Sequence, residues 1–342
     1  MKKLIILLIT ILILLTQSGC AFNVRSGALY TVYPVGYLIE RIAGDYMDSE
    51  PVQTNDLIQV ANASEDIEEL LKTHQYLFSI GELENYLYIR KNLVSSSGIE
   101  TIDLSDMNAI YNFSRYTSVN VNGLTQHIES PYYNGDEFEV IDTYDKDLYL
   151  WLDPISTLSM AKDIYQKISS NYVERSANFE ANYEALEEDL IALDAEYQKL
   201  ANKLKKENSS IKFVSMTASF GCWQKAYGFE VYPVCLSRFG SLPTYNQLQI
   251  IKEKIKADNV QYIVYEPNMT DEMITLFNDL ESELDLKRVN LSNLSSLTDQ
   301  QINDNKNYLM IMYENLKVLE NMVTSNAPQV VETVEAEVEA DE

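Results

Sequence analysis

The most constraining feature of this sequence is a long run of apolar positions at helical spacing. Eight apolar or aromatic residues follow one another at alternating intervals of four and three: Phe179, Tyr183, Leu186, Leu190, Leu193, Tyr197, Leu200 and Leu204. This spacing predicts one continuous apolar face on a helix of about 30 residues, ~45 Å long at 1.5 Å per residue. Its other faces carry acidic residues without the ordered e and g charges of a coiled coil. We therefore interpret it as a rigid helix within one chain and not as a dimerisation helix.

Strand patterns alternate with helix patterns on both sides of this helix. The chain has 342 residues, which is long for a single core, and it is 46% hydrophobic and 23% charged, as expected of a folded body. Strand–helix alternation favours parallel sheets. The expected fold class is α/β, with two lobes that each contain a mostly parallel sheet flanked by helices and are joined by the one long rigid helix.

The pattern also gives boundaries for these parts. Asp153-Pro154 is typical of a helix start, with Asp as the N-cap and Pro in the first turn. Residues 105–146 lose the strand–helix rhythm and are interpreted as a long loop or hairpin, and a last helix is expected over 303–322. The expected parts are a signal peptide (1–19), a linker (20–27), an N-terminal lobe (28–153), helices that include the linking helix (154–206), a C-terminal lobe (210–323) and a disordered acidic tail (324–342).

The N-terminus is typical of an exported protein. Lys2 and Lys3 precede an apolar run that is too short to span a bilayer, and small residues follow it directly before Cys20. This arrangement resembles the bacterial lipobox, which implies cleavage before Cys20 and a lipid anchor on that residue. A conventional secretory signal with an incidental cysteine is the alternative. Either interpretation places the protein outside the cytoplasm, and the first places it at the outer face of the membrane or facing the periplasm, held by lipid alone.

Charge and motifs exclude several classes of function. The formal net charge of −26 repels phosphate backbones, so nucleic acid is not an expected partner. The only histidines are His74 and His127, which leaves little material for a His-rich metal site or a Ser-His-Asp triad, and each is interpreted as a structural residue. The chain contains none of the GxGxxG, HExxH or GxSxG motifs. We therefore expect a protein that is not an enzyme.

Two further cysteines, Cys222 and Cys235, lie in the expected C-terminal lobe. Outside the reducing cytosol a disulfide between them is chemically permitted. Two buried thiols are the other interpretation, and the sequence does not choose between them.

Short motifs spread from about residue 28 to 322 carry a family resemblance. They are Tyr33-Pro34, Ile42-Ala43-Gly44-Asp45, Trp151-Leu152-Asp153-Pro154, Phe220-Gly221, Ala226-Tyr227-Gly228, Leu242-Pro243-Thr244, Gln247-Leu248, Tyr265-Glu266-Pro267, Leu297-Thr298, Tyr308-Leu309 and the run from Met312 to Leu316. In their order and spacing they resemble the zinc- and manganese-binding lipoproteins of metal ABC importers, the helix-linked solute-binding proteins.

The resemblance implies a metal held between the lobes by about four ligands, mostly His with carboxylates. The matching positions here are Tyr149, Thr217 and a position near Ser292, and the range 55–60 contains no histidine. A phenol and two hydroxyl groups are poor ligands for a transition metal, so the inherited site is expected to be degenerate and zinc or manganese binding is in doubt.

Other residues are candidates for the crevice between the lobes. Tyr33, Trp151 and Glu266 are expected there, and a site rebuilt from Glu266 with the cysteines is a less favoured interpretation. The resemblance implies a monomeric solute-binding component that presents a small solute or metal ion to an ABC permease. The alternative function is a surface adhesion or interaction lipoprotein on the same scaffold that binds no metal.

Overall fold

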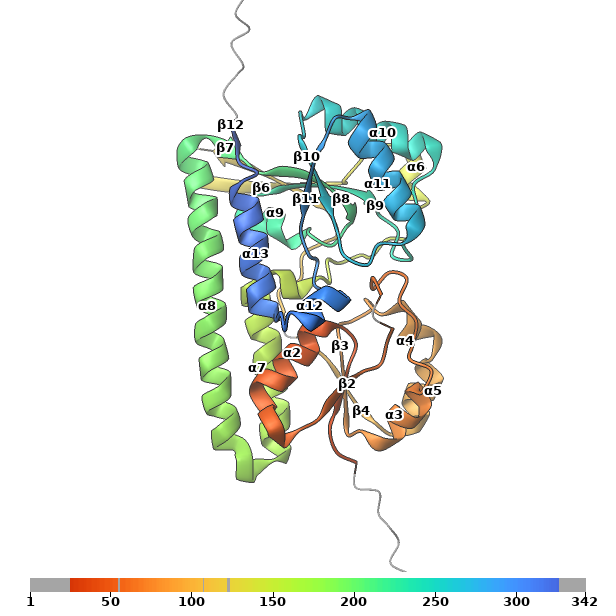
Figure 1. The fold of residues 1–342 in the computed structure, drawn as a ribbon, viewed down its shortest axis with the longest axis vertical. Coiled ribbons are helices and arrows are strands. Elements are labelled where there is room, and N and C mark those ends of the chain that lie inside the picture. The colour runs from red at the N-terminus through yellow and green to blue at the C-terminus, as the bar shows by residue number, and fades with distance from the viewer. Residues whose placement is uncertain (1–24, 55, 107, 122–123, 326–342) are drawn as a thin grey trace, which may run out of the picture.

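The computed structural model describes residues 25–54, 56–106, 108–121 and 124–325. Two lobes lie one above the other, and the long helix α8 (Ser176–Glu207) runs beside both of them (Figure 1). The expected signal peptide and Cys20 lie outside the described residues, as does the expected tail apart from Thr324–Ser325, which form β12. The two-lobed α/β fold with one long linking helix is confirmed.

The N-terminal lobe is built on a four-stranded sheet in the order β2-β1-β3-β4, and every pair in it is parallel. Its strands are β1 (Ala28–Tyr30), β2 (Ser49–Pro51), β3 (Tyr76–Ser79) and β4 (Glu100–Asp103). Its helices are α2 (Tyr33–Ala43), the 3₁₀ turn η1 (Gly44–Tyr46), α3 (Ile67–Thr73), α4 (Asn85–Ile89) and α5 (Lys91–Ser97). All four residues of β3 are buried, as expected of a strand between two neighbours covered by helices.

The C-terminal lobe repeats this plan with the strand order β11-β10-β8-β9, again parallel throughout. Its strands are β8 (Lys212–Thr217), β9 (Glu230–Cys235), β10 (Tyr262–Tyr265) and β11 (Lys287–Asn290). The connecting helices are α9 (Cys222–Tyr227), α10 (Tyr245–Ala257) and α11 (Asp271–Glu283). A complete capping box starts α10, since Thr244 and Gln247 each bond the backbone N–H of the other.

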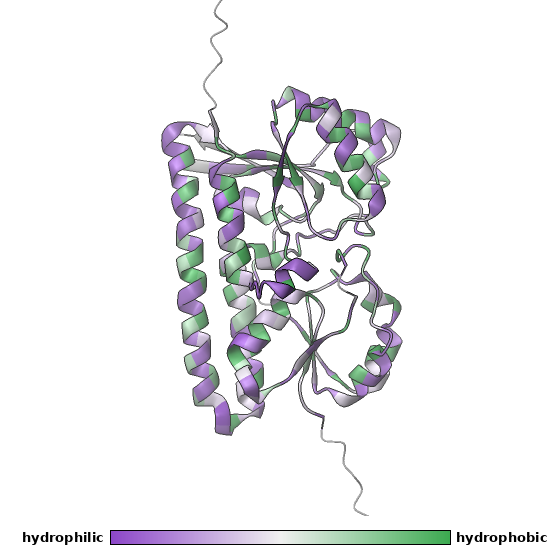
Figure 2. Cartoon of the chain, in the orientation of Figure 1, coloured by the Kyte–Doolittle hydropathy of each residue, from purple (hydrophilic) through white to green (hydrophobic). Residues whose placement is uncertain are grey.

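Helix α7 (Pro154–Asn171) descends beside the N-terminal lobe, the 3₁₀ turn η3 (Val173–Arg175) reverses the chain, and α8 returns along the full molecule (Figure 1). The predicted stripe is buried along all of α8 except at Tyr183, which is half-buried. Apolar and polar residues alternate along α8 accordingly (Figure 2). In the C-terminal half of α8, the Tyr197 hydroxyl donates to the Met312 carbonyl of α13 (2.9 Å). One helix thus packs against both lobes.

Asp153 is the N-cap of α7, as predicted. The helix expected over 303–322 corresponds to α13 (Tyr308–Glu320), and a separate short helix, α12 (Asp299–Asn303), precedes it. Asn305 takes a left-handed φ of 51° between them, and Asn307 caps α13 by accepting from the Met310 N–H (3.0 Å).

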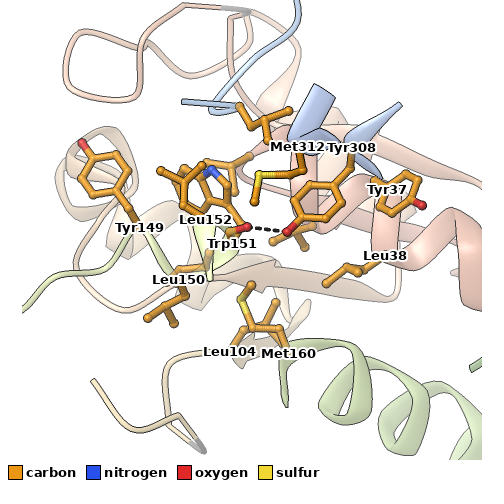
Figure 3. Packing of buried hydrophobic residues seen from close by; sticks show 14 of the residues in the cluster. Tyr37, Leu38, Leu104, Tyr149, Leu150, Trp151, Leu152, Met160, Tyr308 and Met312 are labelled. Carbon is orange, nitrogen blue, oxygen red and sulfur yellow. Dashed lines mark hydrogen bonds between the residues drawn. The ribbon is translucent and has the colours of Figure 1, made fainter. Parts of the chain in front are cut away.

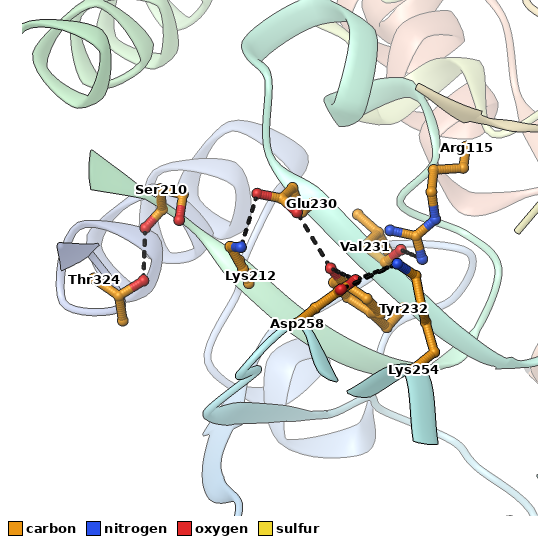
Figure 4. A network of polar contacts seen from close by, with 9 residues as sticks. All are labelled: Arg115, Ser210, Lys212, Glu230, Val231, Tyr232, Lys254, Asp258 and Thr324. Carbon is orange, nitrogen blue, oxygen red and sulfur yellow. Dashed lines mark hydrogen bonds and ion pairs between the residues drawn. The ribbon is translucent and has the colours of Figure 1, made fainter. Parts of the chain in front are cut away.

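The chain does not stay in the N-terminal lobe over the whole expected range 28–153. The antiparallel hairpin β5 (Arg115–Val121) and β6 (Leu124–Ser130), followed by α6 (Asp136–Glu139), lies against the C-terminal lobe (Figure 1). Arg115 is the main anchor: its guanidinium lies 4.2 Å from the centre of the Tyr232 ring and donates to the Val231 carbonyl of β9 (Figure 4). Since β9 is the edge strand of the C-terminal sheet, the hairpin packs beside that edge and is part of the C-terminal lobe.

Residues that follow the β5–β6 hairpin also attach it to the C-terminal lobe. Tyr133 is buried in the C-terminal core, and its hydroxyl donates to the Pro233 carbonyl (2.9 Å). Beside it, Tyr232 donates to Asp258, which also pairs with Lys254 (Figure 4). A second short antiparallel pair joins β7 (Ser209–Ser210) to β12. None of the helices in the described part of the chain is both long and apolar enough to cross a membrane.

Candidate functional site

Polar residues from both lobes meet where the carboxyl ends of the two sheets face each other. From the C-terminal lobe, Thr217 ends β8, and Glu266 and Asn293 lie just beyond β10 and β11. From the other side, Gln59 lies on the segment between β2 and α3, and Tyr149 lies directly before the 3₁₀ turn η2 (Leu150–Leu152). Ligands of open α/β sheets bind at such an edge, so this crevice is the candidate site.

Glu266 is the centre of the site, and none of its surface is exposed. One carboxyl oxygen, Oε1, accepts from the Thr217 N–H (2.8 Å). The other, Oε2, accepts from the Thr217 hydroxyl (2.5 Å) and from the Asn293 amide (2.8 Å). Burial raises the pKa of Glu266, and the hydrogen bonds from Thr217 and Asn293 oppose that rise. Both carboxyl oxygens are therefore already engaged by the protein itself.

Hydrogen bonds continue from Glu266 across to the N-terminal lobe. The Thr217 and Ser219 hydroxyls are hydrogen-bonded to each other, Ser219 bonds the Tyr149 hydroxyl, and Gln59 Nε2 donates to that hydroxyl. Since the Thr217 hydroxyl donates to Glu266, it accepts from the Ser219 hydroxyl. The hydroxyl donors of Ser219 and Thr217 therefore point toward Glu266. We call these six residues the interlobe chain: Gln59, Tyr149, Ser219, Thr217, Glu266 and Asn293.

Tyr149 is held on three sides. Its ring lies against Trp151, with centroids 5.3 Å apart, and its N–H donates to the buried carboxyl of Asp147 (3.2 Å). Its hydroxyl points away from the apolar cluster around Trp151 (Figure 3). Burial raises the pKa of Tyr149 well above its ordinary value, so the phenol keeps its proton at neutral pH. Burial likewise raises the pKa of Asp147 to about 7.

The two lobes touch at this crevice. Asn85 of α4 donates to the Arg238 carbonyl of the C-terminal lobe (2.7 Å), and the Tyr33 N–H donates to the Ser295 carbonyl (3.4 Å). At Gly240, with a φ of +69°, a Cβ atom would lie 2.9 Å from Val60 Cγ1. The crevice is therefore closed, with the turn at Gly240 packed against the segment that carries Gln59.

The residues expected from the sequence divide into two groups. Tyr149, Thr217 and Glu266 join the interlobe chain. Ser292 does not, because its N–H donates to Asn315 (2.9 Å) and its hydroxyl accepts from the Leu294 N–H (3.1 Å). Trp151 is fully buried and does not face open space, and its indole donates to the Asn293 carbonyl (2.7 Å).

The remaining expected residues lie around the site. Tyr33 is half-buried at the start of α2, and burial raises its pKa above its ordinary range. Cys222 and Cys235 are both buried free thiols, so the disulfide that the sequence allowed is not formed. The Cys222 thiol contacts the Tyr149 carbonyl (3.8 Å), and burial raises the pKa of Cys235 to about 12. Burial thus favours the protonated form of both thiols.

Gln59, Ser219 and Asn293 were missed by sequence reasoning. Gln59 lies inside the range 55–60 in which a histidine was sought, so a search for any polar side chain there would have found it. Ser219 and Asn293 each lie within two residues of a position that was singled out. Their roles depend on the exact turn after β8 and after β11, which spacing alone does not give.

The two histidines lie away from the interlobe chain, one at a helix end and one in a hairpin. His74 is buried at the C-cap of α3, with Nδ1 3.0 Å from the Leu70 carbonyl and Nε2 3.8 Å from Glu50. His127 pairs with Ser118 in the β5–β6 hairpin, and its pKa is lowered by partial burial and by Lys225 and Lys205. Neither residue belongs to the interlobe chain.

The side-chain atoms that the site could offer as metal ligands do not fit a transition-metal ion. Zn²⁺ in proteins is held by imidazole nitrogen, thiolate sulfur and carboxylate oxygen. The interlobe chain offers two amides, a phenol, two hydroxyls and a single carboxyl group that already accepts three hydrogen bonds. In the part of the chain that the structure describes, no three His, Cys, Asp or Glu side chains are grouped so that they could hold a metal.

Comparison with curated proteins finds zinc-binding relatives. The chain is 27% identical over 184 residues to the zinc-binding lipoprotein AdcA of Streptococcus pneumoniae, a match that covers 54% of this chain and 35% of that protein. It is 25% identical over 175 residues to the high-affinity zinc uptake system protein ZnuA of Bacillus subtilis, covering 51% of this chain and 53% of that protein. The chain thus matches only about a third to a half of the length of these relatives.

Solved structures share the fold. The periplasmic zinc-binding protein TroA of Treponema pallidum superposes with a TM-score of 0.67 at 16% identity, over 87% of this chain and 99% of that one. The Zn(II)-bound AdcA of S. pneumoniae gives a TM-score of 0.64 at 20% identity, over 91% of this chain and 61% of that one. The laminin-binding protein Lmb of Streptococcus agalactiae, described as an adhesin with metal-transporting activity, gives 0.67 at 18% identity, over 87% and 99%.

A family model covers nearly all of the described chain. The model for the periplasmic zinc-uptake complex component A, ZnuA, matches residues 29–322, which include both lobes and α8. That range also contains all six residues of the interlobe chain. The protein therefore belongs to the family of the periplasmic zinc-uptake complex component A.

Proposed function

We propose that this protein is the extracytoplasmic substrate-binding component of a metal-type ABC importer, anchored through a lipid on Cys20, whose interlobe site no longer holds Zn²⁺ or Mn²⁺ as cargo. Family membership supports a role beside a permease, because the family is a component of an uptake complex and not of an enzyme. The monomeric state and the lipid anchor are parts of this proposal.

The observation that carries the proposal is that the carboxyl group of Glu266 already accepts hydrogen bonds on both oxygens. A carboxylate that is to bind a metal must offer a free lone pair, and its two oxygens have about four in all. Here Thr217 donates twice and Asn293 once to the two oxygens of Glu266. Only one lone pair, on Oε1, is left for a metal, and a metal that took both oxygens would displace buried donors at a cost of about 1–3 kcal/mol each. Neutral phenol, hydroxyl and amide groups cannot offset that cost.

Metal titration tests the proposal. We expect the purified full-length protein to contain less than stoichiometric zinc and manganese, and calorimetry to detect no binding tighter than about 10 μM. The pneumococcal zinc-binding lipoprotein AdcA is the positive control under the same conditions. One tightly bound equivalent of either metal, lost on Glu266→Ala substitution, would overturn the proposal.

A surface interaction protein on the same scaffold is the second candidate. It is favoured by the same observation, since a crevice closed by its own side chains has no evident cargo, and one protein of similar fold is described as an adhesin. Uptake assays in a strain that lacks this protein discriminate the two functions. An importer component gives reduced uptake of some solute, whereas an interaction protein gives unchanged uptake and reduced surface binding.

A further inference from the structure

A second buried carboxyl group, Glu84, lies where the N-terminal lobe meets the C-terminal lobe. Glu84 directly precedes α4 and is only 3% exposed. It accepts from the Thr31 hydroxyl beyond β1 and from the Ile80 N–H beyond β3 (3.1 and 3.4 Å to its two oxygens). The side chain is thereby enclosed at the carboxyl end of the N-terminal sheet, outside the interlobe chain.

The residues on either side of Glu84 connect the lobes. Leu83 accepts through its carbonyl from the Tyr144 hydroxyl (2.8 Å). Asn85 donates through its side-chain amide to the Arg238 carbonyl (2.7 Å), and the Arg238 N–H donates to the Asp142 carbonyl (3.0 Å). The segment that buries Glu84 is therefore the same segment that fastens the N-terminal lobe to the turn after β9.

We infer that Glu84 is a pH-sensitive latch, which holds the lobes together along this seam while its carboxyl group is protonated and releases them when it ionises. A buried carboxylate without a cationic partner is unfavourable, and the simplest relief is exposure to water. Exposure requires the segment from Ile80 to Asn85 to move outward. That movement breaks the hydrogen bond from Asn85 to the Arg238 carbonyl between the lobes, together with the bond from Tyr144 to the Leu83 carbonyl.

The groups around Glu84 favour its neutral form. Burial raises its pKa to about 8, the bonds from Thr31 and Ile80 partly oppose this, and the charge of Asp103 at the end of β4 adds to it. Tyr86 of α4 and Tyr144 face it as neutral phenols, and burial raises the pKa of each above its ordinary range. Arg238, whose carbonyl accepts from Asn85, is already paired with Asp142 (2.9 Å).

The direction of the pH effect follows from this shift. The closed form binds the proton more tightly than an open form with the ordinary pKa of 4.5, so closure is fully stabilised below that value and loses stability as the pH rises toward about 8. Between pH 6 and pH 8 the equilibrium constant for opening is expected to rise about 50-fold and to level off above that range.

Hydrogen exchange measured by mass spectrometry on the full-length protein tests the latch. At each pH the wild type is compared with Glu84→Gln, which keeps the size of the side chain but cannot ionise, so that intrinsic exchange rates cancel. The ratio of the exchange rate of residues 236–241 in the wild type to that in Glu84→Gln should be about 50-fold larger at pH 8 than at pH 6. The matched control Asp147→Asn removes a different buried carboxyl group and should keep the wild-type response.

A second variant keeps the test decisive if Glu84→Gln folds poorly. Asn85→Ala removes the bond to the Arg238 carbonyl and leaves Glu84 in place. Residues 236–241 should then exchange fast already at pH 6, with little further change up to pH 8. Equal exchange of wild type and Glu84→Gln at every pH overturns the inference. So does a pH response confined to residues 80–86, because that would be local unfolding without separation of the lobes.

Discussion

Replacement of Glu266 by Ala is expected to lower the free energy of unfolding by about 3–5 kcal/mol. The change removes the acceptor of three buried hydrogen bonds and leaves the N–H and hydroxyl of Thr217 and the amide of Asn293 without it. It also removes the group toward which the donors of Ser219, Thr217 and Asn293 point. Urea unfolding followed by the fluorescence of the two buried tryptophans, Trp151 and Trp223, measures this loss.

Two further variants separate the role of Glu266 from a general effect of losing a carboxylate. Glu253→Ala, at an exposed position of α10, should change stability by less than about 0.5 kcal/mol. Glu266→Gln keeps the size of the side chain but turns an amide N–H₂ toward donors, so a loss of about 1–3 kcal/mol is expected. A loss below about 1 kcal/mol for Glu266→Ala would mean that the crevice is not organised around this residue.

Replacement of Gly240 by Ala is expected to cost about 2–4 kcal/mol and to separate the lobes at the crevice. Its φ of +69° is unfavourable for a residue with a Cβ atom, and that atom would lie 2.9 Å from Val60 Cγ1 and 3.4 Å from Gln59 Cβ. The turn must move away from the N-terminal lobe to accommodate it. Small-angle scattering should detect a larger radius of gyration, and calorimetry a lower melting temperature.

Gly98 provides a matched control for this substitution. Its φ of +72° is nearly the same, but a Cβ atom there would meet only the Arg25 side chain at ordinary contact distances of 3.6 and 3.8 Å. Gly98→Ala should therefore cost about 1–2 kcal/mol, from backbone conformation alone, and leave the radius of gyration unchanged. If both variants expanded the protein equally, contact at Gly240 would not be what sets the distance between the lobes.

Much of the fold could be predicted because its signals are local. The stripe from Phe179 to Leu204 is buried as its spacing indicates, and Asp153 caps α7 through the Ile155 N–H. Capping and periodicity act within a few residues of the chain, so they can be recognised without tertiary structure. The division into two parallel sheets follows in the same way from the alternation of strands and helices.

The excursion of residues 113–142 to the C-terminal lobe could not be predicted. Its attachment depends on Arg115 stacking on Tyr232 and on the Tyr133 hydroxyl reaching Pro233, each about a hundred residues away in the chain. A polar hairpin sequence such as that of β5 indicates a ribbon but not the sheet that it packs against. The expected N-terminal range 28–153 does not set this segment apart for the same reason.

The site was predicted in part. The resemblance pointed to Tyr149 and Thr217, and both lie in the interlobe chain, whereas the third position fell on Ser292 and the structure uses its neighbour Asn293. A shift of one residue in the turn after β11 decides which side chain faces Glu266. Gln59 escaped notice because an amide is not expected in place of a metal ligand. Its unpaired, buried Oε1 is visible only in three dimensions.

We propose that hydrogen bonds among the protein's own side chains, and not a metal ion, close the crevice. Anomalous diffraction at the zinc absorption edge, from crystals grown in excess zinc, tests it most directly. The predicted result is no anomalous peak among Gln59, Tyr149 and Glu266, with Glu266 still bonded to Thr217 and Asn293. A zinc ion at bonding distance from Glu266, about 2.0–2.2 Å, with those hydrogen bonds broken, would contradict it.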